Sequence, residues 1–91
     1  MSDRYGLRVS KSAEKDLFGL QSKQFTQIVK KIFSLSGNPR PQDCSDLKGL
    51  KGGDRVDQGE FRILYTIDDA AKIIDIFRVG KRNDGEVYKN L

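Results

Sequence analysis

The hydrophobic positions of the chain change their spacing along its length, and each change predicts a different kind of element. Apolar residues alternate with small or polar ones over residues 5–9, which predicts a short strand. Hydrophobic residues three or four apart then indicate two helices. The first has Ser10 or Ser12 as its N-cap and ends near residues 19–21, and the second has Ser22 as its N-cap.

The second helix carries one apolar stripe. Its members follow at helical spacing: Phe25, Ile28, Val29, Ile32 and Leu35. Gly37 and Pro39 supply the signals that end a helix. Because so few residues join the two helices, we expect a helical hairpin whose stripe packs on an apolar surface.

The remainder predicts a loop and three strands. Residues 38–46 form the loop, and residues 47–53 form a glycine-rich turn that matches neither GxGxxG nor GxxxxGK[ST]. The strands cover residues 55–57, 60–67 and 72–82. Gln58 and Gly59 form a two-residue hairpin turn, so that Asp57 pairs with Glu60.

This order of elements predicts an α+β fold. An N-terminal strand and a two-helix hairpin precede a three-stranded antiparallel meander, and the helices pack on one face of the sheet. A chain of 91 residues has room for one hydrophobic core. We therefore expect a single domain over residues 1–91.

The register of the last two strands follows from the core face. The middle strand places four apolar residues on that face: Phe61, Ile63, Tyr65 and Ile67. The register that best matches them pairs Asp68 with Lys72 and sets Phe61 opposite Val79. It sets Tyr65 opposite Asp75, which is the one polar position on this face.

The same register gathers arginines on the other face of the sheet. Arg55, Arg62 and Arg78 form a row across three strands, and Arg82 lies beyond it. Like charges that face each other across strands are destabilising, so packing does not explain the row. Arginine forks match phosphate oxygens, which favours an anion site. The alternative is a solvated face whose charge the acidic residues of the hairpin offset.

Composition removes several classes of chemistry. The chain has no His and a single Cys, Cys44, which excludes a His general base, an internal disulfide and a four-cysteine zinc site. We expect no metal and no cofactor. The formal net charge of +4 suggests an anionic partner such as nucleic acid or an acidic protein. With no apolar run of about 20 residues and no signal peptide, we expect a cytoplasmic protein without membrane contact.

Three segments resemble a known family. They are LKGL at residues 47–50, EFRILY at residues 60–65, and VGKR at residues 79–82 followed by EVY at residues 86–88. Together they resemble the RelE/ParE superfamily of toxins from type II toxin–antitoxin modules. The resemblance implies a RelE-like fold over nearly the whole chain.

RelE-type members of this superfamily are ribosome-dependent mRNA endonucleases that cut the codon in the A site and so inhibit translation. The resemblance therefore implies mRNA on the ribosome as the substrate. It also implies a cognate antitoxin as a protein partner, with operator DNA contacted only through that antitoxin.

The resemblance also assigns roles to residues. Arg62 matches the arginine that holds the scissile phosphate. Arg82 matches the arginine implicated in charge stabilisation and leaving-group protonation. Tyr88 matches the tyrosine that orients or stacks on RNA, and Arg55 stands where the family has a basic residue on the preceding strand. The surrounding basic residues extend an RNA-binding surface: Lys48, Lys51, Arg78 and Lys81.

One position departs from the family pattern. The best-studied RelE toxin has an alternating Lys-x-Lys pair here, with one lysine proposed as the general base, whereas this chain has Arg55, Val56 and Asp57. Asp57 is the candidate for proton transfer that this segment offers, beside Glu60, Lys81 and Tyr88 elsewhere. We expect charge stabilisation by the arginines to carry most of the catalysis, without a metal.

Two other functions stay open at this point. A ParE-type toxin uses a related fold to inhibit DNA gyrase and is not a nuclease. Residues 80–82 together with Val87 and Tyr88 favour the RelE type, because ParE-type chains usually lack a tyrosine placed in this way. The third hypothesis is a non-catalytic module that binds RNA or protein, which the acidic residue at position 57 keeps open.

Overall fold

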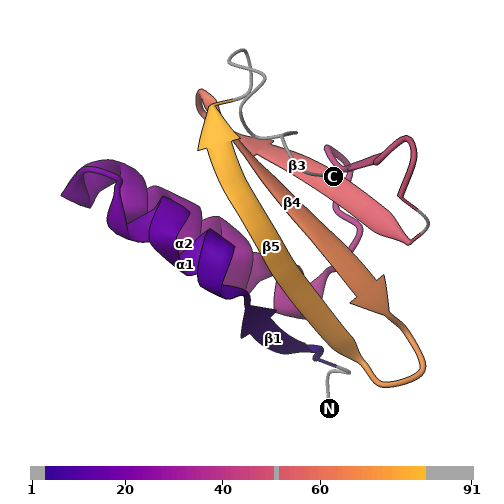
Figure 1. Cartoon of the computed structure of the whole chain (residues 1–91). Coiled ribbons are helices and arrows are strands. Elements are labelled where there is room, and N and C mark those ends of the chain that lie inside the picture. The colour runs from indigo at the N-terminus through magenta and orange to yellow at the C-terminus, as the bar shows by residue number, and fades with distance from the viewer. Residues whose placement is uncertain (1–3, 51, 82–91) are drawn as a thin grey trace.

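Two helices lie together against one side of a five-stranded sheet in the computed structural model of the chain (Figure 1), which describes residues 4–50 and 52–81. The elements are β1 (Gly6–Val9), α1 (Lys11–Phe18), α2 (Ser22–Gly37), β2 (Ser45–Asp46), β3 (Gly53–Gln58), β4 (Phe61–Asp68) and β5 (Ile73–Lys81). The predicted α+β class, with the helices on one face, is confirmed.

The helix boundaries follow local capping chemistry. Ser10 is the N-cap of α1, and its Oγ accepts a hydrogen bond from the backbone N–H of Ala13 at 3.1 Å. The prediction that Ser22 caps α2 is wrong by one residue: Gln21 is the N-cap, and it makes no side-chain capping bond. The packing of the apolar stripe, rather than a cap, therefore fixes the start of α2. In the described part of the chain, neither helix is long and apolar enough to cross a membrane.

The sheet is mixed, with strand order β1-β5-β4-β3-β2. β1 runs parallel to β5, and the other neighbours are antiparallel. The antiparallel meander of β3, β4 and β5 is the one predicted from the sequence. The two-residue strand β2 lies at the end of the segment predicted as a loop, where Ser45 and Asp46 pair with β3.

The main core lies between the helices and the sheet. Its buried members are Ala13, Leu17, Ile28, Ile32, Leu35, Val56, Phe61, Ile63, Tyr65, Ile74, Ile76 and Val79. The predicted core face of β4 is confirmed, because Phe61, Ile63 and Tyr65 belong to this cluster and Ile67 packs against it. Tyr65 is fully buried, and its hydroxyl donates a hydrogen bond to the carbonyl oxygen of Pro39 at 2.8 Å.

The predicted register of β4 and β5 is wrong by one residue next to the turn, where Asp68 pairs with Ile73 rather than Lys72, and by two residues beyond a β-bulge. On the side of the turn Tyr65 pairs with Ile76, and on the far side of the bulge Leu64 pairs with Arg78. Phe77 is therefore the extra residue in β5. A bulge inserts one residue into a strand and reverses the side-chain alternation beyond it. The prediction that Asp75 faces Tyr65 fails because the turn after β4 is one residue longer than predicted, and treating β5 as one regular strand adds the second residue of the shift.

The bulge also explains how β5 serves both faces of the sheet. Ile74 and Ile76, which precede the bulge, and Val79, which follows it, all belong to the main core. Phe77 instead packs against a second, smaller cluster formed by Leu47, Leu50 and Leu64. A loop that follows β2 thus covers part of the sheet face that the helices leave open.

The hairpin between β3 and β4 is displaced by one residue from its prediction. Gln58 pairs with Phe61, so the loop consists of Gly59 and Glu60. Gly59 has a φ of 62°, which the first central residue of a type II′ turn requires and which glycine adopts without strain. Asp57 consequently pairs with Arg62 rather than with Glu60.

Helix α1 completes the outer edge of β5 where β1 ends. The backbone N–H of Ser10 donates to the carbonyl oxygen of Ile76 at 2.9 Å, and its hydroxyl donates to that of Phe77 at 3.3 Å. Further along, Asp16 of α1 accepts a hydrogen bond from the backbone N–H of Val79 at 2.9 Å. The same carboxylate oxygen lies 3.2 Å from Nε of Arg78.

Replacing Asp16 by Ala should therefore destabilise the fold. The substitution leaves the Val79 N–H without its acceptor and the Arg78 guanidinium without its ion-pair partner, and an orphaned, partly buried donor costs about 1–3 kcal/mol. Chemical denaturation of the variant measures the loss in the free energy of unfolding. Glu14→Ala, at an exposed position of the same helix, is the control and should cost less than about 1 kcal/mol. Equal losses in both variants would contradict this role of Asp16.

Candidate nucleic-acid interface

The face of the sheet opposite the helices carries the candidate site. Val56 and Ile63 point into the main core, so their strand neighbours alternate to the other face. Arg55 and Arg62 therefore share this open face, as the sequence predicts. They do not oppose each other, however, because Arg55 pairs with Leu64.

Arg62 binds the carboxylate of Asp57 through two hydrogen bonds. Its Nε donates to Oδ1 at 2.6 Å, and its Nη2 donates to Oδ2 at 3.2 Å. The two residues are direct cross-strand partners, and their side chains retain 16% and 35% exposure for Arg62 and Asp57. Such a two-point contact between a guanidinium and a carboxylate is stronger and more directional than a single-point ion pair.

The predicted row of three arginines is wrong in its arrangement. Arg78 stands opposite Leu64, whereas Arg62 stands opposite Gly80. The longer turn after β4 and the bulge in β5 shift Arg78 away from Arg62, and the displaced hairpin between β3 and β4 shifts Arg55 away from it. Three-quarters of the Arg78 side chain is buried, and its guanidinium contacts Asp16 of α1. Arg78 thus joins β5 to α1, at the edge of the strand that α1 covers.

Two basic residues lie near each other where the loop after β2 passes β3. Lys48 and Arg55 line a surface depression of about 390 Å3, together with Asp46 and Leu47. Lys48 is exposed, and Arg55 is half-buried. Two of the predicted cationic residues, from separate segments of the chain, thus meet on one surface.

The remaining predicted residues fall elsewhere. Lys81 is exposed at the end of β5, opposite Phe61, and strand alternation places it on the other face from Arg62. Lys51, Arg82 and Tyr88 lie outside the described residues. Within residues 4–50 and 52–81, no three Cys, Asp or Glu side chains gather in a group that could hold a metal ion.

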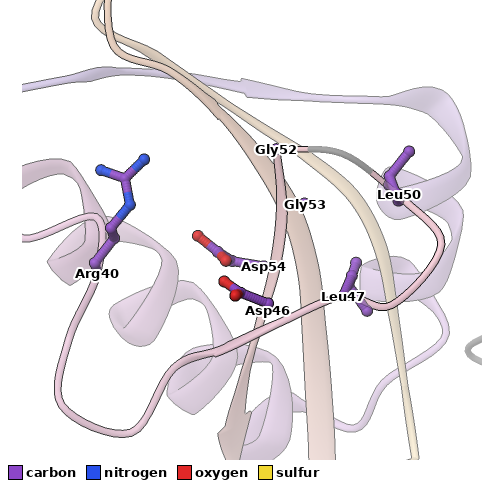
Figure 2. A pocket seen from close by; sticks show the side chains of 7 residues that line it. All are labelled: Arg40, Asp46, Leu47, Leu50, Gly52, Gly53 and Asp54. Atoms are coloured by element: carbon purple, nitrogen blue, oxygen red, sulfur yellow. The ribbon is translucent and has the colours of Figure 1, made fainter.

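A second depression, which the sequence does not indicate, lies beside the first. It has a volume of about 320 Å3 and is lined by Arg40, Asp46, Leu47, Leu50, Gly52, Gly53 and Asp54. Figure 2 shows the two carboxylates side by side and Arg40 across from them. Asp46 and Asp54 are cross-strand partners in β2 and β3, and no local pattern in the sequence reveals that pairing.

Burial raises the pKa of Asp54, and the neighbouring carboxylate of Asp46 raises it further. Arg40 acts in the opposite direction. Its guanidinium binds Asp69, however, at 3.2 and 2.9 Å, and Asp69 also accepts a hydrogen bond from the Tyr5 hydroxyl at 2.6 Å. These contacts lower the pKa of Asp69 to about 2.

Comparison with known proteins identifies the class. The sequence profile described as the ParE toxin of the type II toxin–antitoxin system parDE matches residues 7–85. Putative toxin RelE1 of Methanocaldococcus jannaschii is 32% identical over 90 residues, which span 96% of this chain and 98% of that protein. A sequence match that spans most of both chains defines a small toxin of the type II toxin–antitoxin class.

Solved structures agree with this class. A chain of the RelBE2 toxin–antitoxin complex of Mycobacterium tuberculosis has a TM-score of 0.78 and 31% identity, covering 87% of this chain and 99% of that one. An arginine double mutant of Escherichia coli toxin RelE in the free state has a TM-score of 0.78 and 25% identity, covering 93% and 90%. The chain belongs to the RelE/ParE superfamily of toxins.

Substituting Asn for Asp54 should stabilise the protein at neutral pH. An Asp whose pKa is higher in the folded state than its usual 3.8 is ionised at a cost to the folded state at pH 7. Asn removes that cost, so the melting temperature should rise at pH 7. The gain should shrink as the pH falls toward 3.8, because Asp54 of the parent protein then becomes protonated.

Thermal melts across this pH range test the effect. Glu60→Gln is the control, since it also removes one negative charge but at an exposed loop position. A gain that is the same at every pH, or the same in both variants, would contradict the assignment to Asp54.

Proposed function

We propose that this toxin is a ribosome-dependent mRNA endonuclease that cuts the codon in the A site and so stops translation. The observation that carries the proposal is the open face of β3 and β4, on which Arg55 and Arg62 lie together with Lys48 at its margin. A sheet face with cationic forks suits the phosphates of an extended RNA strand. The likeness to RelE proteins supports the same function.

The proposed reaction is attack of a ribose 2′-oxygen on the adjacent phosphorus. The new bond joins the 2′-oxygen to phosphorus, the bond to the 5′-oxygen breaks, and the products are a 2′,3′-cyclic phosphate and a 5′-hydroxyl. The 2′-OH loses a proton to a base, and the leaving 5′-oxygen gains one. Arg62 would hold the non-bridging oxygens of the phosphate, and Arg55 would add positive charge on the neighbouring strand.

The resemblance to the family supplies the other proposed roles. Arg82 would stabilise the developing charge and protonate the leaving group, and Tyr88 would stack on RNA. Lys48, Lys51 and Lys81 would extend the phosphate-binding surface. The chain has no His for proton transfer, and we propose that positioning of the substrate by the ribosome makes up part of the rate. Free RNA should accordingly be a poor substrate.

We further propose that a cognate antitoxin binds this chain in the cytoplasm and masks the open face. The likeness to toxin chains in RelB–RelE complexes supports such a partner. A basic surface with a net charge of +4 on the whole chain suits an acidic segment of that partner. The toxin would reach operator DNA only through the antitoxin, as a co-repressor.

A gyrase-inhibiting toxin of the ParE type is the second candidate. One observation favours it: the family profile that matches residues 7–85 carries the ParE name. The Arg62–Asp57 pair is also compatible with a surface that binds a protein rather than cuts RNA.

Primer extension on mRNA programmed into 70S ribosomes tests the proposal. The purified toxin should produce cuts at the A-site codon on ribosomes and few or none on the same RNA in solution. Arg62→Ala should lower the cleavage rate by about 10²–10³-fold, because it removes a preorganised partner of the phosphate. Arg8→Ala is the matched control, since Arg8 also pairs with a carboxylate, that of Asp75 at 3.2 Å, but on the edge strand β1, two strands away from β4.

Absence of cuts on ribosomes would contradict the nuclease proposal. A gyrase supercoiling assay on the same preparation then decides the alternative: inhibition by the parent protein would identify a ParE-type toxin. Equal cleavage by the Arg62 and Arg8 variants would be compatible with the nuclease activity but would contradict the proposed role of Arg62 in it.

A further inference from the structure

We propose that Asp57 occupies the phosphate-binding fork of Arg62 in the free toxin, and that RNA binds there only by displacing this carboxylate. The inference rests on the proposed function, because it takes Arg62 as the ligand of a substrate phosphate. It assigns Asp57 the role of an internal competitor that weakens RNA binding, rather than that of a general base.

The geometry of the contact supports this role. A carboxylate offers two oxygens to the two parallel N–H groups of a guanidinium, and a phosphate offers the same arrangement. Asp57 already takes the Nε and Nη2 donors of Arg62, at 2.6 and 3.2 Å. A phosphate that uses the same two donors therefore cannot bind until the pair separates.

The pair lies near the end of a hairpin and is partly exposed. Asp57 lies one residue pair from the end of the hairpin, whose loop is formed by Gly59 and Glu60. Its side chain retains 35% exposure, so rotation toward solvent does not bury its charge. On the other side of Arg62, the partner in β5 is Gly80, which contributes no side chain to this row. Separation of the two side chains breaks none of the backbone pairing between β3 and β4.

The consequence is selection against weak or poorly placed ligands. A single phosphate of free RNA must replace an intramolecular partner that is already in position, whereas an RNA strand held on a ribosome is presented at high effective concentration. The Asp57–Arg62 pair would weaken binding of both by the same factor, but occupancy would fall for free RNA and stay high for a substrate presented at high effective concentration.

Fluorescence anisotropy with a labelled single-stranded oligoribonucleotide, without ribosomes, tests the inference. Asp57→Asn should bind this RNA about threefold to tenfold more tightly than the parent protein, because the fork of Arg62 no longer has to release a carboxylate. The gain should vanish when Arg62→Ala is added. Asp57→Ser provides a second variant with the same expected gain, and circular dichroism checks that each protein is folded.

The matched control is Asp75→Asn. It removes the same charge and releases Arg8 from its ion pair, at a position remote from Arg62. An equal gain in the Asp57 and Asp75 variants would mean that net charge alone strengthens binding, which would overturn the inference. Loss of cleavage on ribosomes by Asp57→Asn, with unchanged RNA affinity, would also overturn it and assign Asp57 to proton transfer.

The binding measurement stays informative if the proposed function fails. A parent protein that does not cleave mRNA on ribosomes would contradict the nuclease proposal. A gain in RNA affinity specific to the Asp57 variants, and dependent on Arg62, would still show that the carboxylate competes for this fork.

Discussion

The backbone of β5 must find hydrogen-bond partners along both of its edges, and the architecture depends on how it does so. β4 covers one edge along its whole length, but β1 covers the other only as far as Ile76. Beyond that point Ser10 and Asp16 of α1 bond directly to the strand. An uncovered edge would leave polar groups unpaired and invite association with other chains. The position of α1 is thus set by hydrogen bonding as well as by its apolar face.

The elements of the fold could be predicted because they depend on local patterns. The helical stripe ending at Leu35 and the alternation around Ile63 are legible from spacing alone. The register could not be predicted, because the turn after β4 is one residue longer than expected and a bulge at Phe77 leaves a sequence pattern that resembles a regular strand. Its physical basis is tertiary: Phe77 reaches a small cluster formed with Leu47 and Leu64, which lie far from it in sequence.

The candidate site could likewise be predicted only in part. That Arg55 and Arg62 share one face follows from strand alternation and was predictable. Their partners were not, because a shift of one residue in the hairpin exchanges Glu60 for Arg62 opposite Asp57. A register error of this size converts an apparent cluster of bare cations into an ion pair. Residue types alone therefore overestimate how much positive charge this face offers to RNA.

The parallel pairing of β1 with β5 has a consequence for how the chain acquires its structure. These strands are separated in sequence by the helices and by the rest of the sheet. Contacts between such distant segments form slowly, because a long loop must close before they contribute stability. A chain emerging from a ribosome can form its helical hairpin early, but β1 has no neighbour until β5 has been synthesised. The sheet therefore cannot close before β5 has been synthesised.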